Sequence, residues 1–382
     1  MPVRDRRLVL LATGVLAALT TAACGSSGGS GGGSGTSTDA IAVTAADDAC
    51  EVATDKLPAG AHTFSVTNTG SKITEFYVYA EGDRIMGEVE NIAPGVARNL
   101  LVELPAGNYQ TACKPGMVGD GIRHDLKVTG EATQLSDDQE LSAAVTSYTG
   151  YVQSQVSALQ EKTREFVEAV KAGDAAKAKS LYPVARSYYE RVEPVAESFG
   201  DLDPKIDARE NDVEPGETWT GFHVLERDLW QTGDLAQSGP VADQLMTDVE
   251  DLATRVKSLE LKPLELANGA LGLLDEIATG KITGEEDRYS HTDLYDFAAN
   301  LEGSEAAIQA LRPVVTGRNA ELATALDTRF AATTAELDKH RAGDGWTSYT
   351  DLAQDQLRAL SDSVNALAAT VSQVPAVIAN GN

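Results

Sequence analysis

His223 and Glu226 are the two residues of this sequence whose types and spacing most directly suit chemistry. On a helix, residues three apart point to one face. An imidazole beside a carboxylate suits a borderline divalent metal such as iron or zinc. The chain has only five His in 382 residues, and this pair lies between Trp219 and Trp230, two of its three Trp. The pattern is short and recurs by chance, so a purely structural pair is the alternative interpretation.

The second half of the chain must supply the helix that carries this pair. Residues 131–382 follow a helical period rich in Ala, Leu, Glu and Lys, which predicts an all-α helical bundle. Ser136 stands three residues before Gln139 and is expected to cap the first helix. Helices are expected over residues 142–172, 175–199, 219–235, 239–260, 290–312, 317–341 and 348–371.

Short β-patterned runs, separated by turns that contain Gly, Pro or Asn, occupy residues 39–130. Roughly six to eight strands in about 90 residues predict a β-sandwich. The clearest runs are residues 62–67, 75–79, 97–104 and 125–129. The fold class is therefore a multidomain α and β chain, with a β-sandwich followed by a helical bundle.

The first 24 residues resemble a bacterial lipoprotein signal peptide. Three Arg precede the apolar residues 8–23, a stretch too short to span a bilayer. Cys24 follows two Ala, as in a lipobox, although Thr21 stands where a larger aliphatic residue is usual. We expect lipidation of Cys24, with cleavage without lipidation as the alternative.

The Gly- and Ser-rich residues 25–38 cannot bury a core and are expected to form a flexible tether. The folded body would then lie outside the cytoplasm, at the periplasmic side or the cell surface, anchored to the cell membrane by lipid.

The net charge of the chain indicates which kinds of partner it can bind. A net charge of −27 argues against nucleic-acid binding, because few groups could neutralise phosphates. Residues 39–130 hold 7 basic and 13 acidic side chains, whereas residues 131–382 hold 21 and 44. A cation site is therefore expected in the helical part, although most of these carboxylates are expected to be solvated helix faces.

Three blocks of the helical part resemble the imelysin-like family. The run GFHVLERDLW is similar to the family's G-x-H-x-x-E signature, and residues 199–223 are similar to the loop that leads into it. Residues 289–303 resemble a block of EfeO-type iron uptake proteins. This resemblance implies a protein that captures iron outside the membrane and delivers it to a membrane iron permease. An exported haem peroxidase of the same system is a further implied partner.

The resemblance also implies a metal site around His223 and Glu226, with iron as the metal and zinc as a substitute in vitro. Asp207 and Glu210 are the next candidates, and their alternative is a salt-bridged loop around Arg209. Two further candidate ligands are His291 and Asp296, which could instead cap a helix and face solvent, respectively.

A metal-dependent peptidase is the runner-up function, because the family is also named for insulin cleavage. A zinc hydrolase needs three protein ligands, an open position and a general base. The chain has no HExxH motif, and Arg227 after Glu226 rules out HxxEH. We therefore do not expect an enzyme. A structural adhesion or scaffold module is a third interpretation.

The strand pattern of residues 39–130 resembles the cupredoxin-like domain of EfeO-type proteins, most specifically in the run Asn-Ile-Ala-Pro-Gly at residues 91–95. This resemblance implies a site for copper or ferric iron. Its candidate ligands are Cys50, Glu75, Cys113 and Met117.

An electron-transfer copper site is not expected in this domain, because the loop between Cys113 and Met117 contains no His. In an oxidising compartment, Cys50 and Cys113 could equally form a disulfide. The disulfide and the thiolate site exclude each other.

Overall fold

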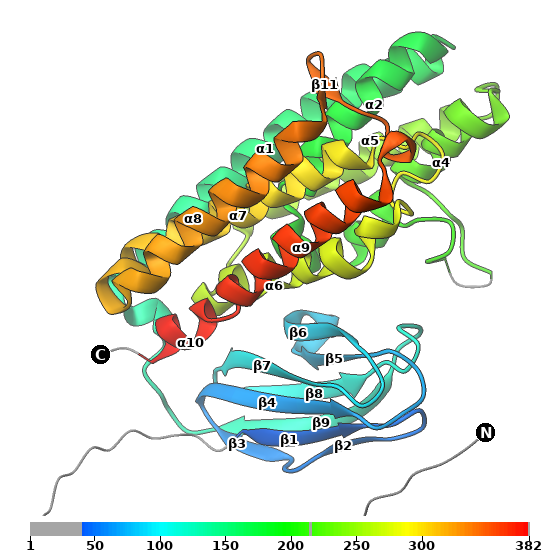
Figure 1. Ribbon diagram of the computed structural model, residues 1–382. Helices are drawn as coiled ribbons and strands as arrows, with labels where there is room; N and C mark the ends of the chain where they lie inside the picture. The colour runs from blue at the N-terminus through cyan, green and yellow to red at the C-terminus, as the bar shows by residue number, and fades with distance from the viewer. Residues whose placement is uncertain (1–39, 214–215, 381–382) are drawn as a thin grey trace, which may run out of the picture. The chain divides into compact units, whose positions relative to one another are not determined.

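The computed structural model describes residues 40–213 and 216–380. The expected signal peptide, the lipidation site Cys24 and the tether lie outside the described residues. Along the described chain, strands come first and helices follow (Figure 1), which confirms the predicted α and β fold class.

The strands form two sheets. One has the order β2 (Cys50–Val52), β1 (Ile41–Ala45), β4 (Gly60–Asn68) and β7 (Ala97–Leu104). The other has the order β3 (Lys56–Pro58), β9 (Ile122–Thr129), β8 (Gly107–Cys113), β5 (Thr74–Tyr79) and β6 (Ile85–Ile92). Neighbouring strands are antiparallel except for β1 with β4 and β3 with β9, which are parallel.

The two sheets share one apolar core, which makes this part a β-sandwich. Along β4 every second side chain is buried, as expected for a strand with one face on a core. Phe64 on β4 meets Phe76 on β5 of the other sheet, with ring centroids 5.4 Å apart. The four predicted runs lie within β4, β5, β7 and β9, so the strand pattern is confirmed.

The second part is a helical bundle, as predicted. Its long helices run alongside one another (Figure 1) and bury a common apolar core. They are α1 (Gln139–Lys171), α2 (Ala175–Glu190), α5 (Gly239–Arg255), α6 (Pro263–Thr279), α7 (Asp293–Arg318), α8 (Ala320–Leu337) and α9 (Gln354–Val371). Three shorter helices are α3 (Asp203–Asp207), α4 (Phe222–Arg227) and α10 (Val374–Ala379). The short strands β10 (Arg341–Ala342) and β11 (Gly345–Trp346) pair between α8 and α9.

Within the described ranges, no helix combines the length and the apolar character that a membrane span would require.

Several helix boundaries differ from the prediction, and two of them have a clear local cause. Asp138, not Ser136, caps α1, because its side chain accepts from the backbone N–H groups of Glu140 and Leu141. The helix expected over residues 175–199 ends at Glu190, and a 3₁₀ segment, η3 (Glu193–Leu202), follows it. Pro at the second position of η3 cannot continue the hydrogen-bond ladder of α2.

Helix α6 was not predicted from the sequence. This helix contains Gly269 and Gly272, which weaken its helical pattern. A Cβ atom on Gly269 would lie 1.7 Å from the carbonyl oxygen of Pro194 in η3. The glycine is therefore required by the close approach of two backbones, and it is not a helix breaker here.

The helix expected over residues 219–235 is much shorter. Only α4 is α-helical, and a π-helical turn, η4 (Asp228–Thr232), follows it. Gly221, with φ 92°, directly precedes α4, and Gly233, with φ 66°, directly follows η4. Neither conformation continues an α-helix, so the glycines set both limits.

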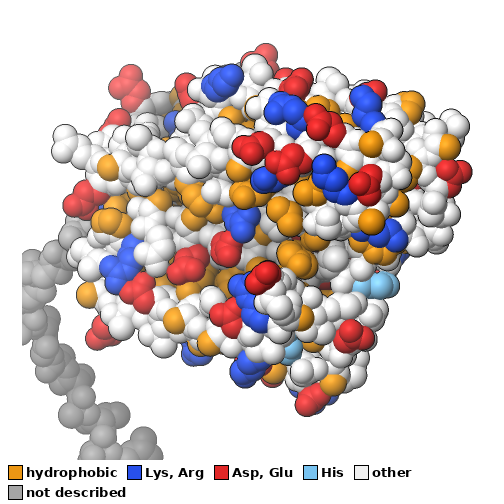
Figure 2. Space-filling view, turned by 90° about the horizontal axis from the view of Figure 1, so that it is seen from above, with side chains coloured by type: hydrophobic (Ala, Val, Ile, Leu, Met, Phe, Trp, Pro, Cys, Tyr) orange, Lys and Arg blue, Asp and Glu red, His pale blue; other side chains and the backbone are white. Residues whose placement is uncertain are grey.

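Acidic and basic side chains are interspersed on the face of the molecule shown in Figure 2. The net charge of −27 therefore does not gather into one acidic patch on that face. The buried carboxylates are the more informative ones.

Candidate metal centre

Gly221 brings α4 against α3. A Cβ atom on Gly221 would lie 2.3 Å from the carbonyl oxygen of Ile206, so only glycine allows this approach. Asp207 is the last residue of α3, and His223 is the second residue of α4. The contact between the two backbones therefore places the carboxylate and the imidazole together.

His223 and Glu226 share one buried face of α4, as their spacing predicted. His223 is 1% exposed and Glu226 is fully buried. The two are joined at 2.9 Å between Nδ1 and Oε2. Because a carboxylate only accepts, Nδ1 carries the proton, and Nε2 keeps its lone pair for another partner.

Backbone groups hold the other oxygen of Glu226. Its Oε1 accepts from the N–H groups of Tyr289 at 2.9 Å and Ser290 at 2.7 Å. Burial opposes ionisation of this carboxyl, but these bonds and the one from His223 lower the pKa of Glu226 below its ordinary value. Glu226 is therefore a fixed anion that orients the imidazole.

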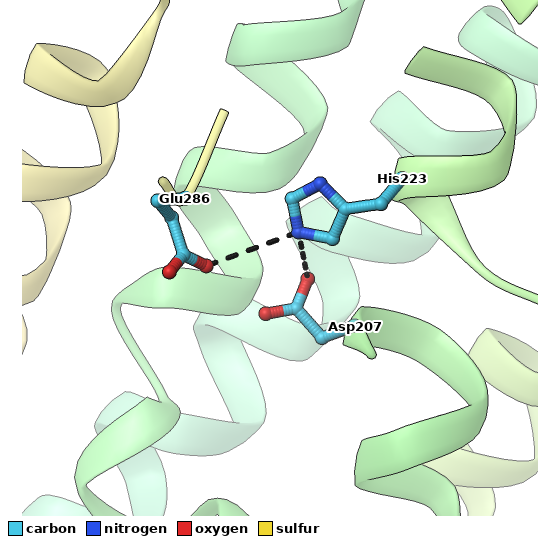
Figure 3. A group of neighbouring side chains, drawn as sticks. All are labelled: Asp207, His223 and Glu286. Carbon is cyan, nitrogen blue, oxygen red and sulfur yellow. Dashed lines mark ion pairs between the residues drawn. The ribbon is translucent and has the colours of Figure 1, made fainter. Parts of the chain in front are cut away.

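Two carboxylates face Nε2 of His223, as Figure 3 shows. Asp207 Oδ1 and Glu286 Oε1 each lie 3.8 Å from it. Ligand atoms of Asp207, His223 and Glu286 lie within 4.8 Å of one another, and a second such group joins His223, Glu226 and Asp287. One imidazole with several carboxylates is a donor set suited to iron and, less selectively, to zinc.

The two carboxylates around Nε2 differ in the direction of their pKa shifts. Burial raises the pKa of Asp207 to about 7. Burial also opposes ionisation of Glu286, but the cations Lys281, 3.8 Å away, and Arg209, 3.1 Å away, lower its pKa. For His223, burial and Arg186 oppose protonation, yet Glu226 and Asp207 raise the pKa above its ordinary value. Protons therefore compete directly for this site near neutral pH.

Sequence comparison shows the families and the named proteins to which this chain is similar. The sequence profile of the imelysin family matches residues 144–374, and that of the cupredoxin-like domain matches residues 10–123. The iron uptake system component EfeO of Escherichia coli K12 is 39% identical over 345 residues, which cover 88% of this chain and 91% of that protein. The same values hold for EfeO of Shigella flexneri.

This chain belongs to the imelysin family, in its EfeO-type form. Among solved structures, a protein described as an iron-regulated protein A precursor from Parabacteroides distasonis aligns with a TM-score of 0.48 and 14% identity, over 65% of this chain and 96% of that one.

The fold does not bring all of the predicted ligands to His223. Glu210 is exposed and accepts a hydrogen bond from the Tyr289 hydroxyl at 2.6 Å. His291, with φ 56°, donates its backbone N–H to Asp287 and makes no side-chain cap for α7. Neither belongs to the two ligand groups found among the described residues. The alternative was a salt-bridged loop around Arg209, and Arg209 does form salt bridges, with Asp212 and Glu286. Among the described residues, it pairs with neither Asp207 nor Glu210.

Asp296 does not have the solvent-facing position that was the alternative to a ligand role. It is fully buried on α7, so it does not face solvent. Its Oδ2 lies 3.4 Å from Nη2 of Arg186, and it is absent from the two ligand groups of the described residues.

Sequence reasoning missed Glu286 and Asp287. They lie in the loop between α6 and α7, a few residues before the block at 289–303 that carried the family resemblance. Buried Arg186 and Lys281 were missed as well. The one available signal was the acidic run Glu285-Glu286-Asp287.

In the sandwich, Cys50 and Cys113 form a disulfide. Of the two alternatives that the sequence left open, the structure has this one, and neither sulfur is a thiolate ligand. Glu75 is buried and bonded to the Tyr77 hydroxyl at 3.0 Å, whereas Met117 is 38% exposed. Within residues 40–213 and 216–380, the sandwich contains no set of three His, Cys, Asp or Glu side chains whose ligand atoms lie within 4.8 Å of one another.

Proposed function

We propose that this chain binds iron outside the cell membrane as part of an iron uptake system and passes it to a membrane permease. The observation that carries the proposal is the group around Nε2 of His223, with Asp207 and Glu286 facing one lone pair. Iron is the cargo, and these three side chains are its proposed ligands. Glu226 holds the ring from its other nitrogen, as partners of metal-bound imidazoles commonly do.

The comparisons support iron as the cargo. The E. coli and S. flexneri relatives are both named as iron uptake system components, and each aligns over nine-tenths of its length. Zinc should also bind, because the same donors suit both metals. The implied exported haem peroxidase remains a proposed second partner.

A peptidase function fits the same site poorly. The general base of a zinc hydrolase needs a carboxylate oxygen that is free to take a proton from water. Both oxygens of Glu226 are already bonded, one to His223 and one to two backbone N–H groups. Its lowered pKa makes it a weaker base still. We therefore do not propose hydrolysis.

We propose that iron binds in the helical bundle and not in the sandwich. The disulfide leaves the sandwich without the thiolates that a copper centre of the expected type would use. A lipid at Cys24 would keep the chain at the membrane, close to the permease.

Neighbouring glutamates offer a matched test. Glu286 is 4% exposed and faces His223, whereas the side chain of Glu285 is 58% exposed. The purified full chain should bind one iron(II) under anaerobic conditions. Glu286→Gln should weaken binding at least about tenfold, equivalent to about 1.4 kcal/mol, and Glu285→Gln should not change it. Equal affinities in the two variants would contradict the proposed site.

A further inference from the structure

Arg186 lies where a metal ion would bind. This residue of α2 is fully buried. Its Nη1 is 2.9 Å from His223 Nε2 and also donates to Asp207 Oδ1, and its Nη2 is 3.2 Å from Glu286 Oε1. These are the same three atoms that surround the proposed iron position.

The guanidinium and a metal ion cannot share those atoms. A guanidinium has donors only, so Arg186 meets Nε2 through the lone pair that a metal would use. Arginine also keeps its charge at any physiological pH. A fixed cation therefore already compensates the carboxylates of this site.

The structure offers a second place for the guanidinium. Nη2 of Arg186 already contacts Glu190, one turn along α2, and lies 3.4 Å from Asp296 Oδ2. Within the described residues, Asp296 Oδ1 and Arg186 Nε are both buried without a hydrogen-bond partner. Nε lies 3.6 Å from Asp287 Oδ1, so it already faces a carboxylate. Unpaired buried polar atoms are costly, so a turn of the guanidinium toward Asp296 would be favoured by the unpaired Oδ1.

From this arrangement we propose that Arg186 is a resident cation that yields to iron by turning toward Asp296, and that returns when iron leaves. The inference rests on the proposed function of the same site. Loading is then an exchange of one cation for another. Without Arg186, an empty cluster of buried carboxylates would be strongly unfavourable. When the guanidinium of Arg186 turns back, it competes with the metal for the same atoms and so favours metal release. A protein that delivers iron to a permease needs such release.

Asp296 acts in this scheme as a positioning residue for Arg186 and not as a ligand. The two roles predict different results when both residues are changed. A direct ligand contributes to affinity whether or not Arg186 is present. A residue that only receives Arg186 loses its effect once the guanidinium is gone, which a double-mutant cycle detects.

The experiment measures the affinity of the full chain for iron(II) and for zinc, and the rate at which a chelator removes zinc. In Arg186→Met, affinity should rise at least about tenfold and release should slow, because the competitor is absent. Asp296→Asn should weaken binding several-fold in the Arg186 background and leave it unchanged in Arg186→Met. Unchanged or weaker binding in folded Arg186→Met would overturn the proposal, as would an Asp296→Asn effect that persists in the double variant.

Folding is controlled separately, because Arg186→Met leaves buried carboxylates uncompensated. If this variant folds only with metal present, the gain in metal affinity must still appear in Arg186→Lys. The Lys ammonium is smaller than a guanidinium and reaches fewer of the three atoms of His223, Asp207 and Glu286. Arg186→Lys should then bind zinc more tightly than the wild type, and equal or weaker binding would overturn the proposal. Failure of the proposed function has a different signature: the wild type itself would bind no metal at His223, and His223→Asn would match it.

Discussion

A Cβ atom on Gly221 would lie 2.3 Å from the carbonyl oxygen of Ile206, so the backbones that carry His223 and Asp207 touch at a glycine. Its φ of 92° is also unfavourable for any residue with a side chain. The site thus depends on a residue that binds nothing.

Gly221→Ala should lower the free energy of unfolding by about 3 kcal/mol or more, from backbone strain and the clash together. It should also weaken iron binding, because α3 and α4 are forced apart. The matched control is Gly150→Ala, an exposed position inside α1 with open space around it. There the same change should raise stability by up to about 1 kcal/mol. Thermal melting compares the two, and similar effects at both positions would refute the role of the contact.

Metal affinity and the stability of the empty protein should depend on pH in opposite directions. Iron must displace protons from Asp207 and His223, whose pKa values are about 7 and above the ordinary value, respectively. Affinity should therefore fall as the pH is lowered from about 8 to about 6. Asp207 has a pKa raised above that of the unfolded chain. Its contribution to the stability of the empty protein is therefore full below about pH 4 and lost as pH rises through about 7.

Titrations at several pH values, with melting curves of the empty protein, check this expectation. Asp207→Asn should flatten the pH dependence of binding, and Glu285→Gln should leave it as it is. An affinity that does not vary between about pH 6 and about pH 8 would show that neither group is a ligand.

The fold was more predictable from the sequence than the site. Residues 97–104 were expected as a strand, and β7 has the same bounds, because alternation and flanking turns are local signals. The six-residue α4 was overestimated at both ends, because the contact that fixes Gly221 is tertiary. α6 was missed for the same reason at Gly269.

The site could be predicted only where its residues share an element. His223 and Glu226 were found because i, i+3 spacing is visible in one helix. Glu286 and Arg186 come from a loop and from α2, more than thirty residues away on either side, and only packing brings them to His223. No spacing rule applies to such residues, and an arginine would not be sought in a metal site.

The disulfide should stabilise the sandwich. With a sequence separation of 63 residues, the bond between Cys50 and Cys113 should contribute about 4 kcal/mol in the chain-entropy model. The Cys50→Ala/Cys113→Ala variant should therefore melt at a lower temperature. In a Cys24→Ser background, thiol titration of the native and the denatured chain should find no free thiol before reduction. Two reactive thiols without reductant would contradict the bond.

Membrane attachment should depend on one residue outside the described part of the chain. If Cys24 is lipidated, Cys24→Ser should move the protein from the membrane fraction to the soluble fraction, since the acyl anchor is lost. Ser27→Ala, in the segment expected to form a tether, serves as the control and should stay with the membranes. A Cys24→Ser protein that still pellets with membranes would disprove the lipid anchor.

The most direct test of the account is the iron affinity of His223→Asn beside that of His340→Asn. Both histidines are buried, but among the described residues only His223 belongs to the ligand groups. Removing a buried imidazole should lower the melting temperature in both variants, so each is first shown to be folded. Calorimetric titration with iron(II) should then give an affinity at least about tenfold lower for His223→Asn, a loss of about 1.4 kcal/mol or more, and an unchanged value for His340→Asn. A folded His223→Asn protein that binds iron as tightly as the wild type would contradict the central claim.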